Sequence, residues 1–212
     1  MSEVPITRVL HNLNLAFMAL AALCSTTAVA KPWQWDIDPS HSSVGFVAKH
    51  LVVAKVRGHF KRYQATLIID DEDLSRSRVE VTIDVDSIDT DVEQRDTHLK
   101  SADFFDAAKF PKMRFVSKSV RKNADGSLVV VGDLTIRDTT KAAVLRVIGP
   151  SSEFKDPQGN PHIAFSATTE VDRFDFGLKW DKKIESGGYV VSPEIAIELE
   201  LELKNKRPYT GS

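Results

Sequence analysis

The segment 194–204, EIAIELELELK, alternates without interruption between large apolar residues and other residues. The apolar members are Ile195, Ile197, Leu199, Leu201 and Leu203, and four of the five residues between 194 and 202 that alternate with them are glutamates. A period of two places one set on each face of a β-strand. The segment therefore predicts a long strand with one oily face and one solvated face.

The rest of the chain repeats this pattern on both sides of that segment. Asn123 to Gly126 predicts a hairpin turn, because Gly126 tolerates the positive φ that such turns need, and Gly58 predicts a bulge or bend. The other expected strands are residues 33–37, 43–50, 56–70, 78–86, 112–122, 128–136, 142–148 and 162–171.

An all-β chain of this kind has few ways to bury its apolar faces. Short turns favour antiparallel pairing, and little helix is available to cover a flat sheet, so a sandwich and a closed barrel remain. The expected strands are longer than the usual 5–6 residues. About eight such strands closed on themselves enclose a lumen that holds either side chains or one slim ligand. The pattern alone does not distinguish a filled lumen from a hollow one.

One stretch interrupts the strands, at residues 89–111. Thr90 and Glu93 have the spacing of a capping box, Val92 and Leu99 share a helical face, and Pro111 ends the segment. We expect a short helical segment near residues 90–109 that closes or lines one mouth of a barrel. A solvated crossover between strands is the alternative.

The first thirty residues have the features of an export signal, with Arg8 ahead of an apolar run and small residues at Ala28 and Ala30. The run is too short for a stable membrane span. We expect cleavage after Ala30, one domain over residues 31–206 and a flexible tail over 207–212. The only cysteine, Cys24, falls in the expected signal, and a lipid-attachment role for it is disfavoured by the bulky Leu23. A net charge of −2 argues against nucleic acid as a partner.

Several blocks of the chain, taken in order, resemble the YceI-like family. The opening block is WDID at 35–38 with HSSVGF at 41–46, followed by VRGHF at 56–60. The central block is EQRDTHL at 93–99 with DFFD at 103–106 and Phe110-Pro111. GDLTI at 132–136, FSATT at 165–169 and DFGL at 175–178 complete the resemblance. It covers nearly all of the chain after residue 30, and departs little from the family pattern.

This resemblance implies an eight-stranded antiparallel up-and-down lipocalin-like β-barrel. It also implies export to the periplasm and binding of a polyisoprenoid chain, such as a prenylquinone or polyprenyl lipid, inside the barrel. The family is described as binding rather than catalytic, so no enzyme activity and no cofactor other than the bound lipid are expected. Homodimer formation is left open.

Apolar residues of the expected strands and of the helical segment are the candidate ligand wall, with ordinary core packing as the alternative for each. They are Val44, Phe46, Phe60, Val81, Ile83, Phe104, Phe105, Phe110, Phe115, Phe165 and Trp180.

Three polar residues are candidate head-group contacts: His41, Arg95 and His98. Arg95 and His98 lie one helical turn apart. For His41 the competing interpretation is a turn fixed by the preceding Asp38-Pro39-Ser40. No nucleophile motif and no tight metal-ligand spacing is present, so no catalytic and no metal residues are predicted.

Three functions follow as hypotheses. The first is a periplasmic carrier that holds a long isoprenoid lipid in an apolar lumen. The second is an enzyme that acts on a lipid-like substrate in the same cavity, with His41 or His98 as acid–base residue. The third is an interaction module of the cell envelope that binds no ligand.

Overall fold

The computed structural model describes residues 32–51, 53–180, 182 and 189–210. The expected signal and its cleavage site lie outside the described residues. The elements before the helix are β1 (Trp33–Ile37), β2 (Ser43–His50), β3 (Ala54–Phe60), β4 (Tyr63–Ile69), the 3₁₀ turn η1 (Leu74–Arg76), β5 (Arg78–Asp84), η2 (Val85–Ser87) and β6 (Ile88–Asp89). After them come α1 (Glu93–Lys100), β7 (Lys112–Lys122), β8 (Leu128–Ile136), β9 (Thr139–Ile148), β10 (Phe154–Lys155), β11 (Pro161–Asp172), η3 (Arg173–Phe176) and β12 (Val191–Pro208).

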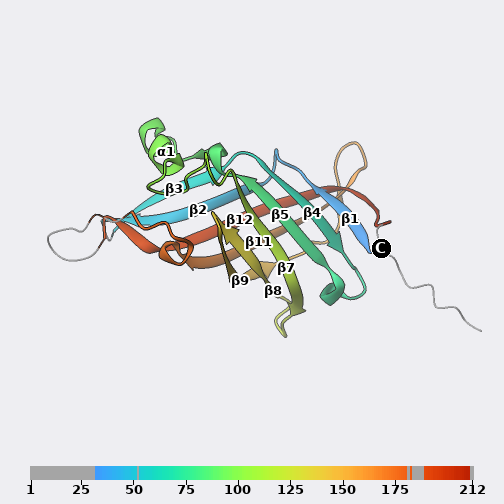
Figure 1. Ribbon diagram of the computed structural model, residues 1–212. Coiled ribbons are helices and arrows are strands. Elements are labelled where there is room, and N and C mark those ends of the chain that lie inside the picture. Colours follow the sequence, from blue (N-terminus) through green and yellow to red (C-terminus); the bar gives the residue numbers. More distant parts are fainter. Residues whose placement is uncertain (1–31, 52, 181, 183–188, 211–212) are drawn as a thin grey trace, which may run out of the picture.

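The strands close into an eight-stranded antiparallel barrel (Figure 1). We call each of the eight strand positions around the barrel a stave. Three staves are each made of two consecutive strands, β1 with β2, β3 with β4, and β5 with β6. The other five are β7, β8, β9, β11 and β12, and pairing of β11 with β12 closes the ring. Each stave neighbours the next along the chain, which confirms the predicted up-and-down barrel.

The strand β12 is the longest strand of the barrel and pairs with three others. It pairs with β11 over ten consecutive residues, from Leu203 opposite Ile163 to Glu194 opposite Asp172. On its other edge it pairs first with β2 and then with β1. The strand continues to Pro208, and Arg207 binds Asp36 of β1 through both guanidinium amines at 2.8 Å. Arg207 and Pro208 therefore belong to the barrel, whereas we expected a tail from residue 207.

Two predicted strands are interrupted. Residues 56–70 form β3 and β4 with a break at Lys61 and Arg62, whose backbone amides donate to the carbonyl and hydroxyl of Ser87. Residues 78–86 leave strand geometry at Val85, which turns inward in η2 and is 1 % exposed. Alternation did not show the second break because the apolar residues from Val79 to Val85 keep their period into η2. At the first break the inward-facing set changes from even to odd positions between Phe60 and Tyr63, and this shift in the alternation marks the interruption.

Gly58 does not mark a bulge, because the β2–β3 register runs through it without a shift. A Cβ at this position would lie 2.4 Å from the ring of Phe46 and 2.7 Å from Thr90. The residue is small because an aromatic ring packs directly on its backbone. Gly126 does take the expected positive φ, at 87°.

The core has two clusters of apolar side chains. The larger includes Phe60, Val85, Ile88, Phe104 and Phe176 and reaches the end of the barrel near α1, which we call the α1 end. The smaller contains Trp35, Leu67, Ile69, Ile163 and Leu203 and lies toward η1, at the η1 end. Among the described residues, no helix is both long and apolar enough to cross a membrane.

Candidate functional site

The barrel encloses an apolar cavity of about 170 Å³. All eight staves contribute to its wall, and every lining residue except Ser77 and Thr169 is apolar. The wall includes Leu67 and Leu203 near the η1 end, Val81 and Leu199 in the middle, and Ile83 toward the α1 end. Such a wall offers contact to hydrocarbon and almost no polar recognition.

The middle of the lumen is incompletely filled. Val81, Leu145, Phe165 and Leu199 line the cavity, yet each keeps part of its surface accessible. In a solidly packed core these residues would be fully covered, because protein interiors leave few voids larger than a water molecule. The lumen is therefore hollow over this stretch.

The α1 end, in contrast, is plugged by aromatic side chains. Phe104 is 5 % exposed and its ring lies 5.3 Å from that of Trp180 and 5.0 Å from that of His98. Phe60 contacts Phe46 and Phe105 at ring distances of 5.8 and 6.1 Å. The helical segment thus closes one mouth, as expected, through the packed residues that follow the helix.

The predicted wall residues divide between these two environments. Val44, Val81, Ile83, Phe115 and Phe165 line the cavity. A second group packs in the aromatic plug and does not line the cavity: Phe46, Phe60, Phe104, Phe105 and Trp180. Phe110 lies apart, with Lys109 and Arg137 over its ring.

The local structure of α1 differs from the predicted capping box. Within the described residues, the helix begins after Val92, with no side-chain cap, and Val92 is exposed. Thr90 is buried and donates from both its amide and its hydroxyl to Asp96. The predicted capping box at Thr90 and Glu93 is wrong, because Thr90 lies two residues before the N-cap position at Val92.

The two helical head-group candidates have protein partners. Arg95 donates to the hydroxyl and carbonyl oxygens of Thr90 at 2.7 and 2.6 Å. His98 Nε2 lies 2.9 Å from Asp103, and its ring stacks edge-on against Trp180. Neither residue lines the cavity.

His41 lies in the turn between β1 and β2, outside the cavity. Its Nδ1 is 3.2 Å from Asp38, whose carboxylate also accepts from the Ser40 amide, so the turn interpretation describes its geometry. Burial alone would raise the pKa of Asp38, but hydrogen bonds from Ser40, His41 and Lys204 lower it to about 2. Burial also raises the pKa of Tyr63, helped by the negative charge of Asp38.

A short turn covers the cavity at the η1 end. Leu74 and Ser77 line the cavity there. The turn is held by Asp70, which is 3 % exposed and accepts two bonds from Arg76, at 2.7 and 3.0 Å. These bonds lower the pKa of the Asp70 carboxyl, although burial opposes the shift.

One seam of the barrel is weakly paired. The strands β9 and β11 pair at only three positions, Arg146 to Ile148 opposite Thr168 to Ser166. Across the described residues, no ladder pairing joins the remainder of β9 to β11. A surface groove of about 680 Å³ runs along this seam, and Ala143, Thr169 and Ile197 line both the groove and the cavity. A single layer of side chains therefore separates the lumen from solvent here.

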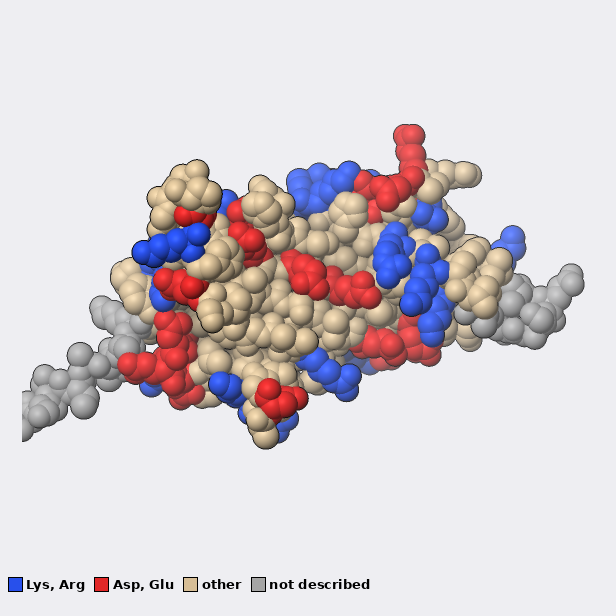
Figure 2. All heavy atoms as spheres, turned by 180° about the vertical axis from the view of Figure 1, so that it is seen from behind, with Lys and Arg blue, Asp and Glu red and all other residues tan. Residues whose placement is uncertain are grey.

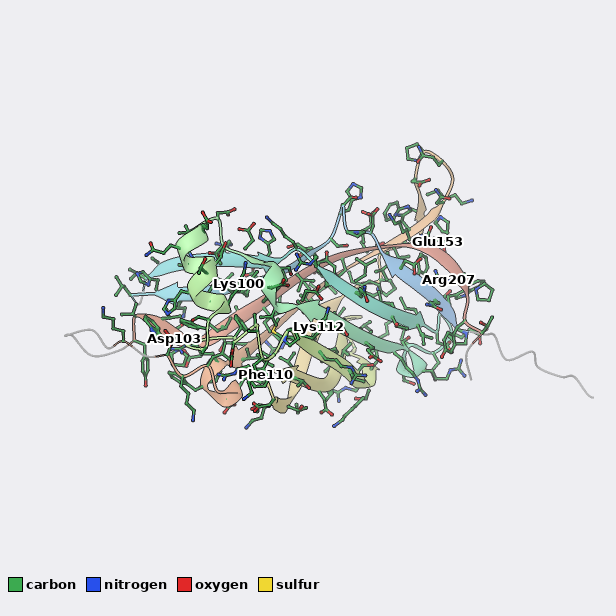
Figure 3. The ribbon with its side chains drawn as sticks, turned by 45° about the horizontal axis from the view of Figure 1, so that its top comes forward. Lys100, Asp103, Phe110, Lys112, Glu153 and Arg207 are labelled. Carbon is green, nitrogen blue, oxygen red and sulfur yellow. The ribbon has the colours of Figure 1, made fainter. Side chains whose placement is uncertain are left out.

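The outer surface shows no concentration of one charge on the face in Figure 2, where Lys and Arg are interspersed with Asp and Glu around uncharged residues. Figure 3 places Lys100, Asp103 and Phe110 in the half of the molecule with α1, and Glu153 and Arg207 toward the opposite end. Between these two ends lies the hollow stretch of the barrel.

Sequence reasoning missed much of the cavity wall. Ile37, Ala65, Leu145 and Leu201 line it but were not proposed. Their signal was present, because each falls on the apolar face of an alternating strand. The aromatic residues that were chosen instead include five that pack in the plug, two of them from the helical segment.

Comparison with known proteins places these features in context. Residues 35–203 match the family described as YceI-like domain. The chain is 36 % identical over 172 residues to protein YceI of Salmonella newport, covering 79 % of this chain and 88 % of that protein. It is 36 % identical over 171 residues to protein YceI of Escherichia coli O157:H7, covering 80 % and 87 %.

Solved structures show the same fold. The Campylobacter jejuni YCEI protein matches with a TM-score of 0.63 and 31 % identity, over 75 % of this chain and 90 % of that one. BcnA of Burkholderia cenocepacia has a TM-score of 0.67 at 23 % identity, covering 79 % and 99 %. A domain from Saccharophagus degradans described as polyisoprenoid-binding has a TM-score of 0.55 at 14 % identity, covering 80 % and 97 %.

Proposed function

The chain belongs to the YceI-like domain family, and on that premise we propose that it is a carrier that holds one long isoprenoid lipid, such as a prenylquinone, in its barrel. The observation that carries the proposal is the hollow middle of the lumen, where apolar side chains face one another without filling the space. The polyisoprenoid-binding description of the Saccharophagus degradans domain, which shares the fold, supports the choice of ligand class.

The size of the cavity sets what binding requires. At about 170 Å³ it resembles an apolar void of about 150 Å³ that stays dry and binds benzene. It therefore accommodates roughly one isoprene unit as it stands, and a longer tail has to part the facing side chains. Burying an isoprene unit is worth about 3 kcal/mol at 25 cal/mol per Å². Several units would offset both this rearrangement and the ordering of the tail.

The seam between β9 and β11 is the proposed entry route. Few backbone hydrogen bonds have to break there, and Ala143, Thr169 and Ile197 line both the groove and the cavity. A slim, flexible chain fits such a slot better than a fused-ring molecule. The plugged α1 end would have to unpack its aromatic rings to serve as a mouth.

The head group is proposed to rest at the η1 end. The indole nitrogen of Trp35 is buried there and has no hydrogen-bond partner among the described residues. Trp35 packs with Leu67 and Leu203, which line the cavity. Buried donors are normally paired, and a quinone carbonyl would satisfy this one. His41 and His98 lie outside the cavity, so binding without catalysis is the function we propose, and export to the periplasm is proposed with it.

Native mass spectrometry of protein purified from a lipid-containing host tests the proposal. We expect a population carrying one co-purified lipid, and uptake of one added prenylquinone per chain after delipidation. Bare protein that takes up no prenylquinone would refute the carrier function. Conversion of the added lipid to a product would instead indicate the enzyme hypothesis.

A further inference from the structure

A second site lies on the outside of the barrel, away from the lumen. Asp38, His162 and Glu202 each offer a ligand atom, and these atoms lie within 4.8 Å of one another. His41 adds a fourth, with Nδ1 at 3.2 Å from Asp38 Oδ2 and 3.8 Å from Glu202 Oε1. His162 Nδ1 is 2.8 Å from the same Glu202 oxygen. One imidazole and two carboxylates thus form a compact cluster, and the second imidazole, of His41, lies beside its two carboxylates.

Backbone pairing fixes the positions of these residues. Glu202 lies opposite Ala164 in the β11–β12 ladder, and His162 is two residues earlier on the same outer face. Asp38 follows β1 and its amide donates to the Glu202 carbonyl at 2.8 Å. Asp38 and His162 are each 5 % exposed. Side chains held by three neighbouring staves are pre-positioned rather than gathered by chance.

Both ring nitrogens of His162 are directed at carboxylates. Its Nδ1 faces Glu202 and its Nε2 faces Asp156 at 3.4 Å, so both ring nitrogens point at carboxylate oxygens. A neutral imidazole has one N–H and satisfies only one of them. A cation bound at Nδ1, with Nε2–H directed to Asp156, would satisfy both, which is the carboxylate–histidine–metal arrangement common around bound metals.

The charges around the point also favour a divalent cation. Asp38, Asp156 and Glu202 bring three carboxylates, and Lys204, 3.2 Å from Asp38 Oδ1, is the lysine that faces them. Metal–ligand bonds of 2.0–2.2 Å in a tetrahedron separate the ligand atoms by about 3.3–3.6 Å. The nitrogen–oxygen distances between these imidazoles and carboxylates, 2.8, 3.2 and 3.8 Å, bracket that value. Small side-chain adjustments would suffice.

We propose that Asp38, His41, His162 and Glu202 form a binding site for a divalent transition-metal ion of the zinc class. Mixed imidazole and carboxylate ligands suit Zn²⁺ and Co²⁺ and not Mg²⁺ or Ca²⁺, which prefer oxygen alone. The His41 side chain is 63 % exposed, so the ion reaches the site from solvent. A surface groove of about 410 Å³, lined by His41, Glu202 and Pro150 among others, lies directly beside it.

Metal titration of the purified protein tests this site. The protein is prepared without an affinity tag. Cys24 is replaced by Ser, so that no thiol binds the metal ions in any chain that keeps its first thirty residues. After treatment with a chelator and dialysis, Zn²⁺ is titrated by calorimetry, and Co²⁺ by visible absorption, which reports four-coordinate geometry. We expect one ion per chain and an intense Co²⁺ band.

Variants separate the site from other metal binding. The His41 side chain is exposed, so we expect His41→Gln to keep the fold. We expect this variant to bind Zn²⁺ and Co²⁺ about tenfold or more weakly, a typical loss when the ligand shell is disturbed. His162→Gln should abolish the Co²⁺ band, with circular dichroism confirming the fold. His98→Gln, also paired to a carboxylate, is the matched control and should bind as the parent does.

The result that would overturn the proposal is absence of Co²⁺ and Zn²⁺ binding by the parent, or binding unaffected by both His41→Gln and Glu202→Gln. Either would show that the cluster is a closed hydrogen-bond network. Lipid uptake is measured in the same samples. Because the site lies outside the lumen, loss of metal binding and loss of lipid binding are separate outcomes.

Discussion

The two halves of the barrel have the same strand pattern but different interiors. At the α1 end, Phe60 and Phe104 are nearly inaccessible, and rings from distant segments contact one another. In the hollow middle, Phe165 and Leu199 face a cavity and keep accessible surface. The difference teaches that alternation specifies a barrel but not its contents. Whether the lumen is filled depends on what the connecting segments insert into it.

The largest expected effect compares one phenylalanine from each half. Phe104→Ala should lower the free energy of unfolding by about 3–5 kcal/mol, because it empties a packed site. Phe165→Ala should cost about 1–2 kcal/mol, since its ring already borders empty space. Urea denaturation of both variants measures the difference. Equal losses would mean that the two halves are packed alike.

Filling the hollow half should remove ligand binding without harming the fold. Ala65→Phe adds a ring to the cavity wall and should weaken prenylquinone binding about 100-fold, or about 2.7 kcal/mol. Thr66→Phe places the same ring on the exposed outer face of the same strand, β4, as a control and should bind normally. Fluorescence titration of both variants reads the affinity. Similar affinity for both would place the ligand outside the lumen.

The η1 end should respond to acid through Asp70. Its pKa is lowered in the folded state, so its charge stabilises the fold above the ordinary pKa near 4, and this stability is lost as the pH falls toward the lowered value. Asp70→Asn should cost about 1–3 kcal/mol at pH 7, because Arg76 and the backbone amides of Glu72 and Asp73 lose their charged partner. Unfolding of the parent and the variant between pH 7 and pH 2 should show that the difference between their free energies of unfolding becomes smaller as the pH falls. A difference that stays constant with pH would rule out the charge of Asp70 as its source.

The head-group position can be tested at Trp35. Trp35→Phe removes the unpaired indole donor and should weaken binding of a prenylquinone about three- to tenfold, the worth of one hydrogen bond. Binding of a headless isoprenoid hydrocarbon should change less, and this comparison is the control. An equal loss for both ligands would point to packing instead.

The smallest effect is expected at the seam. Lys141 and Asp175 approach to 3.9 Å beside the groove, and such exposed pairs contribute at most about 1 kcal/mol. Lys141→Met should speed lipid uptake about two- to threefold in stopped-flow measurements with little change in affinity. Lys118→Met, which breaks the pair with Asp133 elsewhere on the barrel, is the control. The same acceleration in both variants would exclude the seam as the route.

The fold was largely predictable from the sequence. The apolar face of 197–203 lines the lumen as expected, and the helix and the turn at Gly126 lie where their residues indicated. The site was harder to predict. Phe60 and Phe165 read alike in the sequence, and only the packing of the helical segment separates plug from wall. The outer cluster joins Asp38 to Glu202 across more than 160 residues, so no short spacing could reveal it.

The central claim is that a long apolar chain occupies the hollow half of the barrel. A crystal structure of the protein saturated with a long-tailed prenylquinone tests it most directly. We predict continuous density for the tail between Val81 and Leu199, in a lumen wider than the present cavity, with the rings at the α1 end unmoved. Density for the lipid on the outer surface alone, with the lumen unchanged, would contradict the account.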